Sequence, residues 1–483
     1  MTRFPQVKKL TTAAAFDARC AELGIELPRV GEPGAAVRAV AEPLEVAGHR
    51  VGNRFCILPM EGWDATADGA VTDLVRRRWA RFGESGAKLI WGGEAVAVRP
   101  DGRANPHQLR LGTDTVEDIA DLRVGLVAAH EALHGTSDDL LVGLQLTHSG
   151  RFARPDGDPA PQTAYRHPVL DPRLGIADSS AVLSDDELDE LVGDVVAAAV
   201  LARQAGFAFV DVKHCHGYLG HELLSGVDRP GRYGGDLAGR TRFLRSIVEG
   251  IRTDAPGLGI GVRLSAFDMV PYRHGDERGE PDLEPGQAYP YAFGGDGTGL
   301  GVDLTETHLF CELLSELDIE LLCVTAGSPY YVPHIQRPAY FPPSDGYAPP
   351  EDPLVGVARM LAAARELTTA HPGLTVVASG LSYLQEWIGP VAEGLVADGW
   401  CHSVGLGRVA LSYPLLPADV LAGREPERQL VCRTFSDCTT APRNGLVSGC
   451  YPLDPFYKDR PERVELAAAK RASREALGPP PPR

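Results

Sequence analysis

The feature that most constrains the fold is a regular alternation, along residues 54–423, of short apolar runs with longer segments of helical period. The short runs predict strands at 54–60, 88–98, 140–146, 207–213, 258–264, 320–324, 374–378 and 401–406. The longer segments predict helices near 73–86, 116–134, 185–205, 237–254, 304–318, 353–370, 384–398 and 408–423. Eight strand and helix pairs favour a closed (β/α)8 barrel, the TIM barrel, over an open doubly wound sheet, which usually has fewer strands.

The start of the third helix is predicted in most detail. Ser184 is followed by Glu187, the spacing of a capping box, and an apolar periodic run begins at Leu188. In a capping box each side chain accepts a hydrogen bond from the other residue's backbone N–H, so this pair fixes the first turn.

The barrel is expected to span residues 43–424, with an N-terminal extension over 1–42 and a C-terminal extension over 425–483. The first extension holds a short helix around 12–23, and the second holds a Cys-bearing loop and a helix near 461–476. Two long connections, 151–183 and 268–303, follow the third and fifth strands and would lie at the C-terminal rim, where barrels build active sites. We expect them to be walls or lids; a disordered insert at 275–301 is the alternative.

Charge and composition exclude several classes of partner. The chain of 483 residues has 47 basic and 65 acidic residues, a formal charge of −18, which disfavours nucleic acid and anionic membranes. No apolar run approaches the ~20 residues of a membrane span, and residues 1–10 lack a secretory apolar segment. Nine Cys residues are too few for a disulfide framework in a chain of this length. We therefore expect a cytoplasmic protein with a small-molecule substrate, and a homo-oligomer is left open.

Polar and small residues gather at the predicted strand ends, which supply the catalytic groups of barrel enzymes. Glycines after the seventh and eighth strands, Gly380 and Gly407, stand with Arg408 where barrels often bind phosphate. Gln145 and Arg263 end the third and fifth strands and could face the polar edge of a planar ring. Flavin mononucleotide (FMN) is a planar cofactor with a phosphate and fits this description.

Several motifs in this order resemble the old yellow enzyme group of NADH:flavin oxidoreductases, which includes the 2,4-dienoyl-CoA reductase and trimethylamine dehydrogenase barrels. The resemblance covers about residues 42–420, and its motifs are Asn53-Arg54, Pro59-Met60, Glu94-Ala95, Pro100-Asp101-Gly102-Arg103, Gln145-Leu146, His216-Gly217-Tyr218, Arg232-Tyr233-Gly234-Gly235 and Gly407-Arg408. It implies an FMN barrel in which NADH or NADPH reduces the flavin, which then passes the hydride to a substrate.

The resemblance also implies roles for individual residues. Those expected to hold FMN are Pro59, Met60, Ala95, Gln145, Arg263, Gly380, Gly407 and Arg408. Tyr218 stands where ene-reductases protonate the substrate's α-carbon, and Lys213 and His216 stand where the family binds the substrate carbonyl. The expected reaction is NAD(P)H-driven reduction of an activated C=C bond.

Three other functions are open to the same residues. One is an FMN-dependent amine or N-methyl dehydrogenase or demethylase, which the positive charge of Lys213 disfavours because it would repel a cationic substrate. A Schiff-base lyase with Lys213 as nucleophile belongs to another class of enzyme. The last is a flavin-binding subunit without catalytic activity.

Two positions near the expected flavin depart from the family pattern. Lys213 replaces a usual His, and it could stabilise an enolate, hold a carboxylate or pair with Glu or Asp. Glu61 replaces a usual Cys or Thr, so it either points away from the ring or lowers the flavin potential. Trp63 could line the substrate pocket or only pack. His214 and Cys215 are expected to pack or to act behind the site.

The tail departs as well. Dienoyl-CoA-reductase-like relatives hold a [4Fe-4S] cluster with Cys-x2-Cys-x3-Cys-x11-Cys, and here Cys438 and Cys450 keep the last spacing. Cys432 is one residue out of register, and Thr434 stands where a second ligand is expected. We expect a vestigial loop; a cluster with a non-Cys fourth ligand, a zinc site and a redox pair are the alternatives. No Gly-x-Gly-x-x-Gly appears beyond 424, so no nucleotide-binding half is expected.

Overall fold

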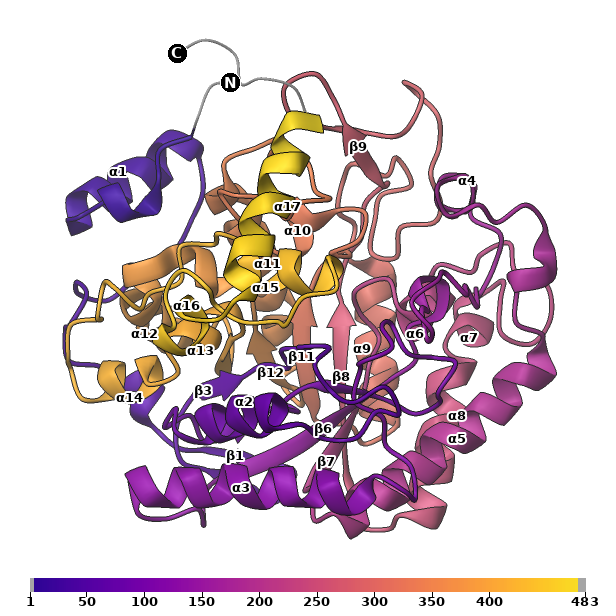
Figure 1. Ribbon diagram of the computed structural model, residues 1–483, viewed down its shortest axis with the longest axis horizontal. Helices are drawn as coiled ribbons and strands as arrows, with labels where there is room; N and C mark the ends of the chain where they lie inside the picture. The colour runs from indigo at the N-terminus through magenta and orange to yellow at the C-terminus, as the bar shows by residue number, and fades with distance from the viewer. Residues whose placement is uncertain (1–3, 477–483) are drawn as a thin grey trace.

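A computed structural model describes residues 4–476 as a closed parallel barrel wrapped by helices (Figure 1). Its strands are β3 (Phe55–Ile57), β4 (Leu89–Ile90), β5 (Ala95–Ala97), β6 (Leu141–Thr147), β7 (Phe209–Val212), β8 (Gly259–Ser265), β11 (Leu321–Thr325), β12 (Thr375–Ala378) and β13 (Ser403–Leu406). All neighbours pair in parallel, and β13 pairs with β3 while β4 pairs with β6, which closes the ring. The predicted TIM barrel is confirmed.

The second barrel strand differs from the prediction. Residues 88–98 were expected to form one strand, but they form β4 and β5, and both pair with β6. Gly93 lies between them with a φ of 57°, in the left-handed region that favours glycine. A Cβ atom there would lie 2.5 Å from the Trp79 ring. Gly92 and Gly93 therefore interrupt the strand, and Gly93 lets the backbone turn close to the buried indole of Trp79.

Helices cover the outside of the barrel. They are α2 (Asp73–Gly83), α3 (Val116–His134), α5 (Asp185–Gln204), α7 (Leu237–Arg240), α8 (Arg242–Asp254), α9 (Thr305–Glu316), α11 (Pro353–Ala370), α12 (Ile388–Ala397), α13 (Arg408–Ser412) and α14 (Leu416–Leu421). The capping box at α5 is present, with Ser184 N donating to Glu187 over 2.7 Å and Glu187 N donating to Ser184 Oγ over 3.2 Å. The single helix predicted at 408–423 is wrong: Pro414 cannot continue a helix, and α13 ends before it.

A hairpin that the sequence pattern did not predict closes the N-terminal end of the barrel. It consists of β1 (Leu44–Val46) and β2 (His49–Val51), which pair antiparallel. Val46 and Val51 are buried in one apolar cluster with the interior residues Trp91 and Phe209. The hairpin thus fills the N-terminal mouth of the barrel, which leaves the C-terminal mouth for a ligand.

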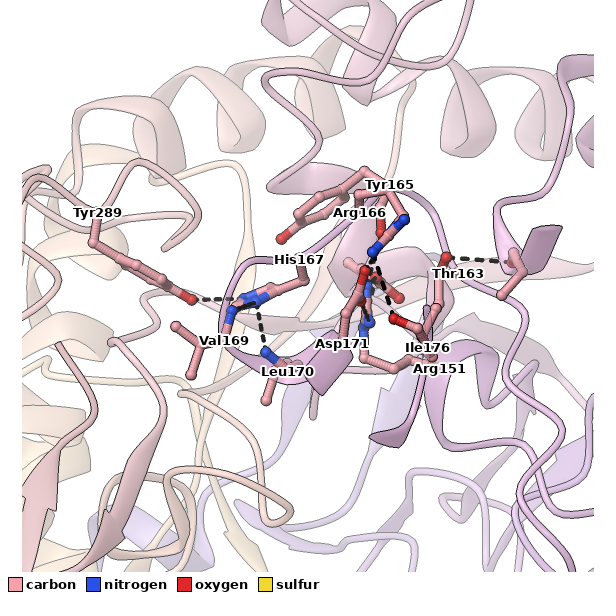
Figure 2. A network of polar contacts seen from close by, with 12 residues as sticks. Arg151, Thr163, Tyr165, Arg166, His167, Val169, Leu170, Asp171, Ile176 and Tyr289 are labelled. Carbon is pink, nitrogen blue, oxygen red and sulfur yellow. Dashed lines mark hydrogen bonds and ion pairs between the residues drawn. The ribbon is translucent and has the colours of Figure 1, made fainter. Parts of the chain in front are cut away.

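The two long connections at the rim are ordered and are fastened to each other (Figure 2). In the first, which contains α4 (Leu170–Leu174), the buried Arg151 forms ion pairs with Asp171 and Glu222. His167 Nε2 lies 2.8 Å from the hydroxyl oxygen of Tyr289, which belongs to the second connection. The second connection also folds as a hairpin of β9 (Tyr272–His274) and β10 (Gly279–Pro281). Residues 275–301 are therefore part of a structured wall.

The two extensions lie against the barrel. Helix α1 (Ala13–Leu23) matches the predicted N-terminal helix and is tied to the start of α11 by an ion pair of Arg19 with Asp352. The tail holds α15 (Asp437–Arg443), α16 (Pro455–Lys458) and α17 (Glu462–Ala476), drawn in yellow in Figure 1. Asp454 accepts hydrogen bonds from Arg77 of α2 over 2.9 and 3.0 Å and so clasps the tail to the barrel. Within residues 4–476, no helix is long and apolar enough to cross a membrane.

Candidate active site

A cavity of about 190 Å3, open to solvent on one side, lies at the C-terminal ends of the strands. The residues singled out from the sequence that line it are Pro59, Met60, Glu61, Trp63, Gln145, Lys213, His216, Tyr218, Arg263, Gly380, Gly407, Arg408 and Cys438. Ala95, Cys432 and Cys450 do not line it; Ala95 is buried within β5.

One wall is organised by a buried carboxylate that the sequence reading did not single out. Asp211 of β7 accepts hydrogen bonds from Gln145 Nε2 over 2.5 Å and from Trp91 Nε1 over 2.8 Å. The backbone N–H of Arg263 donates to its other oxygen over 2.7 Å. Burial raises the pKa of Asp211. Asp211 engages one of the two N–H groups of the Gln145 amide, so the other N–H and the carbonyl oxygen are left for a ligand in the cavity.

A second wall carries the residues expected to bind phosphate. Gly380 has a φ of 95°, which favours glycine, and stands at the start of a short 3₁₀ segment, Leu381–Trp387. Arg408 Nη2 donates to the carbonyl of Pro338 over 3.0 Å. Its Nη1 is buried without a hydrogen-bond partner among the described residues, and burial lowers the pKa of this guanidinium. The wall therefore offers a cation whose hydrogen-bonding capacity is not used by the protein.

The third part of the cavity is a polar cluster around Glu61. Lys213 Nζ lies 3.1 Å from Glu61 Oε1 and 3.9 Å from the centre of the Tyr218 ring. Trp63 Nε1 donates to Glu61 Oε2 over 2.9 Å, and the Tyr218 hydroxyl donates to the same oxygen over 3.4 Å. Glu61 thus lines the cavity with its charge matched by Lys213. Lys213 both pairs with a carboxylate and faces the cavity.

Burial governs the protonation of Tyr218. The side chain is 3% exposed, and burial and the Glu61 charge raise the pKa of its phenol well above the usual value. Its oxygen lies 3.0 Å from the hydroxyl of Tyr330, a residue of the loop after β11. Tyr218 therefore keeps its proton at neutral pH, as a general acid must.

Hydrogen bonds of its backbone N–H and carbonyl fix the position of His216. Its φ is 68°, its N–H donates to Ser265 Oγ over 3.1 Å and its carbonyl accepts from Ser328 Oγ over 2.8 Å. Nε2 lies 3.0 Å from Gln336 Nε2. Burial, and then the charges of Arg263 and Lys213, lowers the pKa of His216 well below its usual value, so the ring is neutral. The neighbours His214 and Cys215 are buried and do not line the cavity.

The three tail cysteines come together without forming a metal site. Cys438 lines the cavity, and the pKa of the buried Cys450 is raised well above its usual value by burial and by the nearby thiols of Cys432 and Cys438. All three are free thiols. Across residues 4–476, no group of three or more His, Cys, Asp or Glu side chains is arranged to hold a metal ion.

Sequence reasoning missed the part of the cavity built by the loop after β11 and by the tail. These residues are Tyr330, Gln336, Arg337, Thr439, Pro442 and Arg443. The signal was a third long connection, residues 326–352, which is richer in Pro and aromatic residues than the connections 151–183 and 268–303. It follows the sixth barrel strand and so also reaches the rim.

The unused polar groups of the cavity test whether it suits FMN. Arg263 Nε and Arg408 Nη1 are buried and have no hydrogen-bond partner within residues 4–476. An unmatched buried donor is costly, and a ligand with a polar ring edge and a phosphate would satisfy both. The residues present therefore fit FMN.

Residues 40–278 match the sequence profile of the NADH:flavin oxidoreductase / NADH oxidase family. The matched segment, which includes the barrel strands β3 to β8, belongs to this family. A family relative, the NADPH dehydrogenase of Bacillus subtilis, is 28% identical over 244 residues, 48% of this chain and 65% of the relative. An NADH:flavin oxidoreductase of Gibberella zeae is 28% identical over 267 residues, 51% of this chain and 61% of the relative. The chain thus spans less than two thirds of the length of these family members.

Solved structures agree with the fold. The chain is similar to a 2-naphthoyl-CoA reductase with a TM-score of 0.64 and 18% identity, over 87% of this chain and 57% of that one. It is also similar to an old yellow enzyme homologue of Zymomonas mobilis, with a TM-score of 0.55 and 19% identity over 80% of this chain and 93% of that one. The family fold is therefore present across the barrel.

Proposed function

We propose that this protein is an FMN-dependent oxidoreductase that uses NADPH or NADH to reduce an activated C=C bond. The observation that carries the proposal is the pairing of two features in one cavity. Unused donors on Arg263 and Arg408 suit FMN, and a protonated Tyr218 stands beside Lys213 and His216. Membership of the NADH:flavin oxidoreductase family supports the same reaction class.

Gln145, Arg263 and Arg408 would hold FMN, which would supply the chemistry of hydride transfer between NAD(P)H and the substrate's β-carbon. The protein supplies the proton and the polarisation. Tyr218 donates its phenolic proton to the α-carbon, because its raised pKa keeps the hydroxyl protonated until a strongly basic carbon forms beside it. Lys213 and neutral His216 can each donate a hydrogen bond to the substrate carbonyl, where negative charge develops.

Glu61 has a positioning role in this scheme. Its two oxygens hold Lys213 on one side and Trp63 and Tyr218 on the other. Its negative charge is offset by Lys213, so the pair adds no net charge to the cavity. An ammonium held in an ion pair has no lone pair to attack a carbonyl, which weighs against a Schiff-base lyase.

The test is Tyr218→Phe. This change removes the proton donor and leaves the donors expected to hold FMN. We expect anaerobic bleaching of the flavin by NADPH or NADH to continue at the wild-type rate. Reoxidation by an enone should slow by roughly 100-fold or more, the usual contribution of a general acid.

The matched control is Tyr383→Phe, which removes the hydroxyl of another buried tyrosine. That hydroxyl has no hydrogen-bond partner within residues 4–476, and the side chain does not line the cavity. In the control, flavin reduction by NADPH or NADH and flavin reoxidation by the enone should both proceed at the wild-type rates. Equal rates of enone reduction in wild type and Tyr218→Phe would remove Tyr218 from the mechanism.

A further inference from the structure

Arg337 is a buried cation with unused hydrogen bonds in the wall of the cavity. It follows the short helix α10 (Pro333–Gln336), is 7% exposed and lines the cavity. Its Nη1 donates to the hydroxyl of Thr439, which belongs to α15 of the tail. Nε and Nη2 are buried and have no partner within residues 4–476. The tail thus fixes one edge of a guanidinium whose other donors are free.

The charges around Arg337 do not balance it. The charge with the largest influence on Arg337 is the cation Arg408, which adds to burial in lowering the pKa of Arg337 to about 10. The nearby carboxylate Asp345 is taken by Arg443, which contacts both of its oxygens at 2.6 Å. Two guanidinium groups therefore lie together in a low-dielectric wall without a carboxylate of their own, an arrangement that favours an anion between them.

The two groups are tied to one piece of backbone. Arg408 Nη2 donates over 3.0 Å to the carbonyl of Pro338, the residue that follows Arg337. Gly380, Ser382 and Gly407 line the same cavity. Arg337 keeps Nε and Nη2 without partners, a planar fork of the kind that binds two oxygens of one anion, and Arg408 adds its unpartnered Nη1. A phosphate with about two negative charges matches two cations better than a carboxylate with one.

We infer that Arg337 and Arg408 together form a two-guanidinium site for the phosphate of FMN, with Arg337 positioned by Thr439 of the tail. The inference rests on the proposed function, and it goes further in making the loop after β11 and the C-terminal extension parts of the cofactor site. Neither segment was assigned such a role by the sequence motifs.

Binding of FMN and of riboflavin tests this inference, because riboflavin has the same ring and side chain without the phosphate. Protein freed of flavin would be titrated with each compound and binding followed by quenching of flavin fluorescence. Arg337→Gln should weaken FMN binding by about 10-fold to 100-fold, the range for charge-assisted hydrogen bonds. Its affinity for riboflavin should stay within about twofold of the wild type. Thr439→Val should weaken FMN binding by a smaller factor, again without affecting riboflavin.

Arg359→Gln is the control for loss of a positive charge. Arg359 pairs with Glu351 over 2.6 Å and does not line the cavity, so both affinities should be unchanged. If Arg337→Gln does not fold, Arg337→Lys keeps the charge without the fork and should still lower FMN affinity more than riboflavin affinity.

Two results would overturn the inference. Equal losses for FMN and riboflavin would make Arg337 a structural residue. Unchanged binding of both, with a raised KM for NAD(P)H or for an acidic substrate, would assign Arg337 to a different anion. A wild-type protein that binds neither flavin would instead contradict the proposed function itself, so the two failures are distinguishable.

Discussion

Glu61 and Lys213 are unequal partners. The Lys213 side chain is 3% exposed and the Glu61 side chain is 17% exposed. Glu61 also accepts hydrogen bonds from Trp63 and Tyr218, so it keeps two partners if Lys213 is lost. Lys213, by contrast, has no other acidic partner at ion-pair distance within residues 4–476. Removal of the Glu61 carboxylate should therefore lower the free energy of unfolding more than removal of the Lys213 ammonium.

This asymmetry predicts that Glu61→Gln lowers the free energy of unfolding by about 3 kcal/mol and Lys213→Met by roughly half as much. Both changes nearly preserve side-chain volume, so the comparison isolates charge. Denaturant unfolding of the flavin-free variants measures the difference. In the double variant part of the loss should be recovered, because no buried charge is left alone. A larger decrease in the free energy of unfolding for Lys213→Met than for Glu61→Gln would contradict this asymmetry.

Asp268 makes stability depend on pH. Its carboxyl accepts hydrogen bonds from the Tyr331 hydroxyl over 2.6 Å and from Met269 N over 2.8 Å, and burial raises its pKa from 3.8 to about 7. A raised pKa in the folded state means that stability is fully present below about pH 4 and is lost as pH rises through about 7. His221, 3.8 Å away, has a pKa lowered to about 3 and stays neutral over this range.

Wild type should therefore lose about 2 kcal/mol more stability than Asp268→Asn between about pH 5.5 and about pH 8.5. Asn has no charge to bury, so the variant lacks this one contribution. Unfolding of both proteins at matched pH values gives the difference, in which the other titrating groups cancel. Parallel pH profiles would show that Asp268 does not titrate in this range.

At the scale of elements, the tail decides the shape of the cavity. Helix α15 brings Cys438, Thr439 and Arg443 to the cavity wall. Arg443 is fixed by Asp345 and by the carbonyl of Pro329 over 3.0 Å, and its guanidinium lies 5.2 Å from the centre of the Tyr330 ring. The tail and the loop after β11 thus support each other. The buried hydrogen bonds of Asp454 with Arg77 hold them on the barrel.

Asp454→Ala should loosen the tail and leave the barrel intact. The Asp454 side chain is 2% exposed, pairs with Arg77 and caps α16 by accepting from Phe456 N over 3.0 Å. Losing both contacts should speed amide hydrogen exchange in residues 437–458 by roughly 10-fold to 100-fold, with no change in α5.

Glu462→Ala is the control for that experiment, because its pair with Arg460 lies within the tail and is partly exposed. Such a pair contributes only about 0–1 kcal/mol, so exchange should barely change. Uniformly faster exchange in α5 and the tail would mean that Asp454 supports the whole fold.

Local signals explain which elements could be predicted. The capping box at Ser184 sets the start of α5 by contacts within four residues, and the structure confirms it. The division of 88–98 into β4 and β5 depends on the buried Trp79 ring, which lies close to Gly93 only in the folded chain. The hairpin β1–β2 is likewise defined by what it covers, the interior of the barrel.

The candidate site divides in the same way. Residues near the C-terminal ends of strands or in the loops that follow them, such as Gln145, Arg263 and Tyr218, could be placed because the barrel topology brings these ends together. Arg337 and Thr439 could not, since they meet through a loop and a tail that no periodic pattern relates. The ion pair of Glu61 with Lys213 was foreseen only as one alternative for Lys213, without its partner.

For the whole molecule, the charge of the cavity lining contrasts with the net charge of the chain. The chain carries a formal charge of −18, yet the cavity is lined by Lys213, Arg263, Arg337, Arg408 and Arg443 against the single carboxylate of Glu61. A positive cleft in an acidic protein concentrates the field on one site and attracts anionic cofactors there. The cavity is therefore suited to a flavin phosphate.

The most direct test of the account is the flavin content and anaerobic reduction of the freshly purified protein, followed by absorbance. We expect a yellow protein with about one FMN per chain, bleached by NADPH or NADH and recoloured by an enone. Iron measured on the same sample should be at background, as expected for a vestigial Cys loop. A colourless protein that takes up no FMN, or a bound flavin that neither nucleotide reduces, would contradict the proposed function.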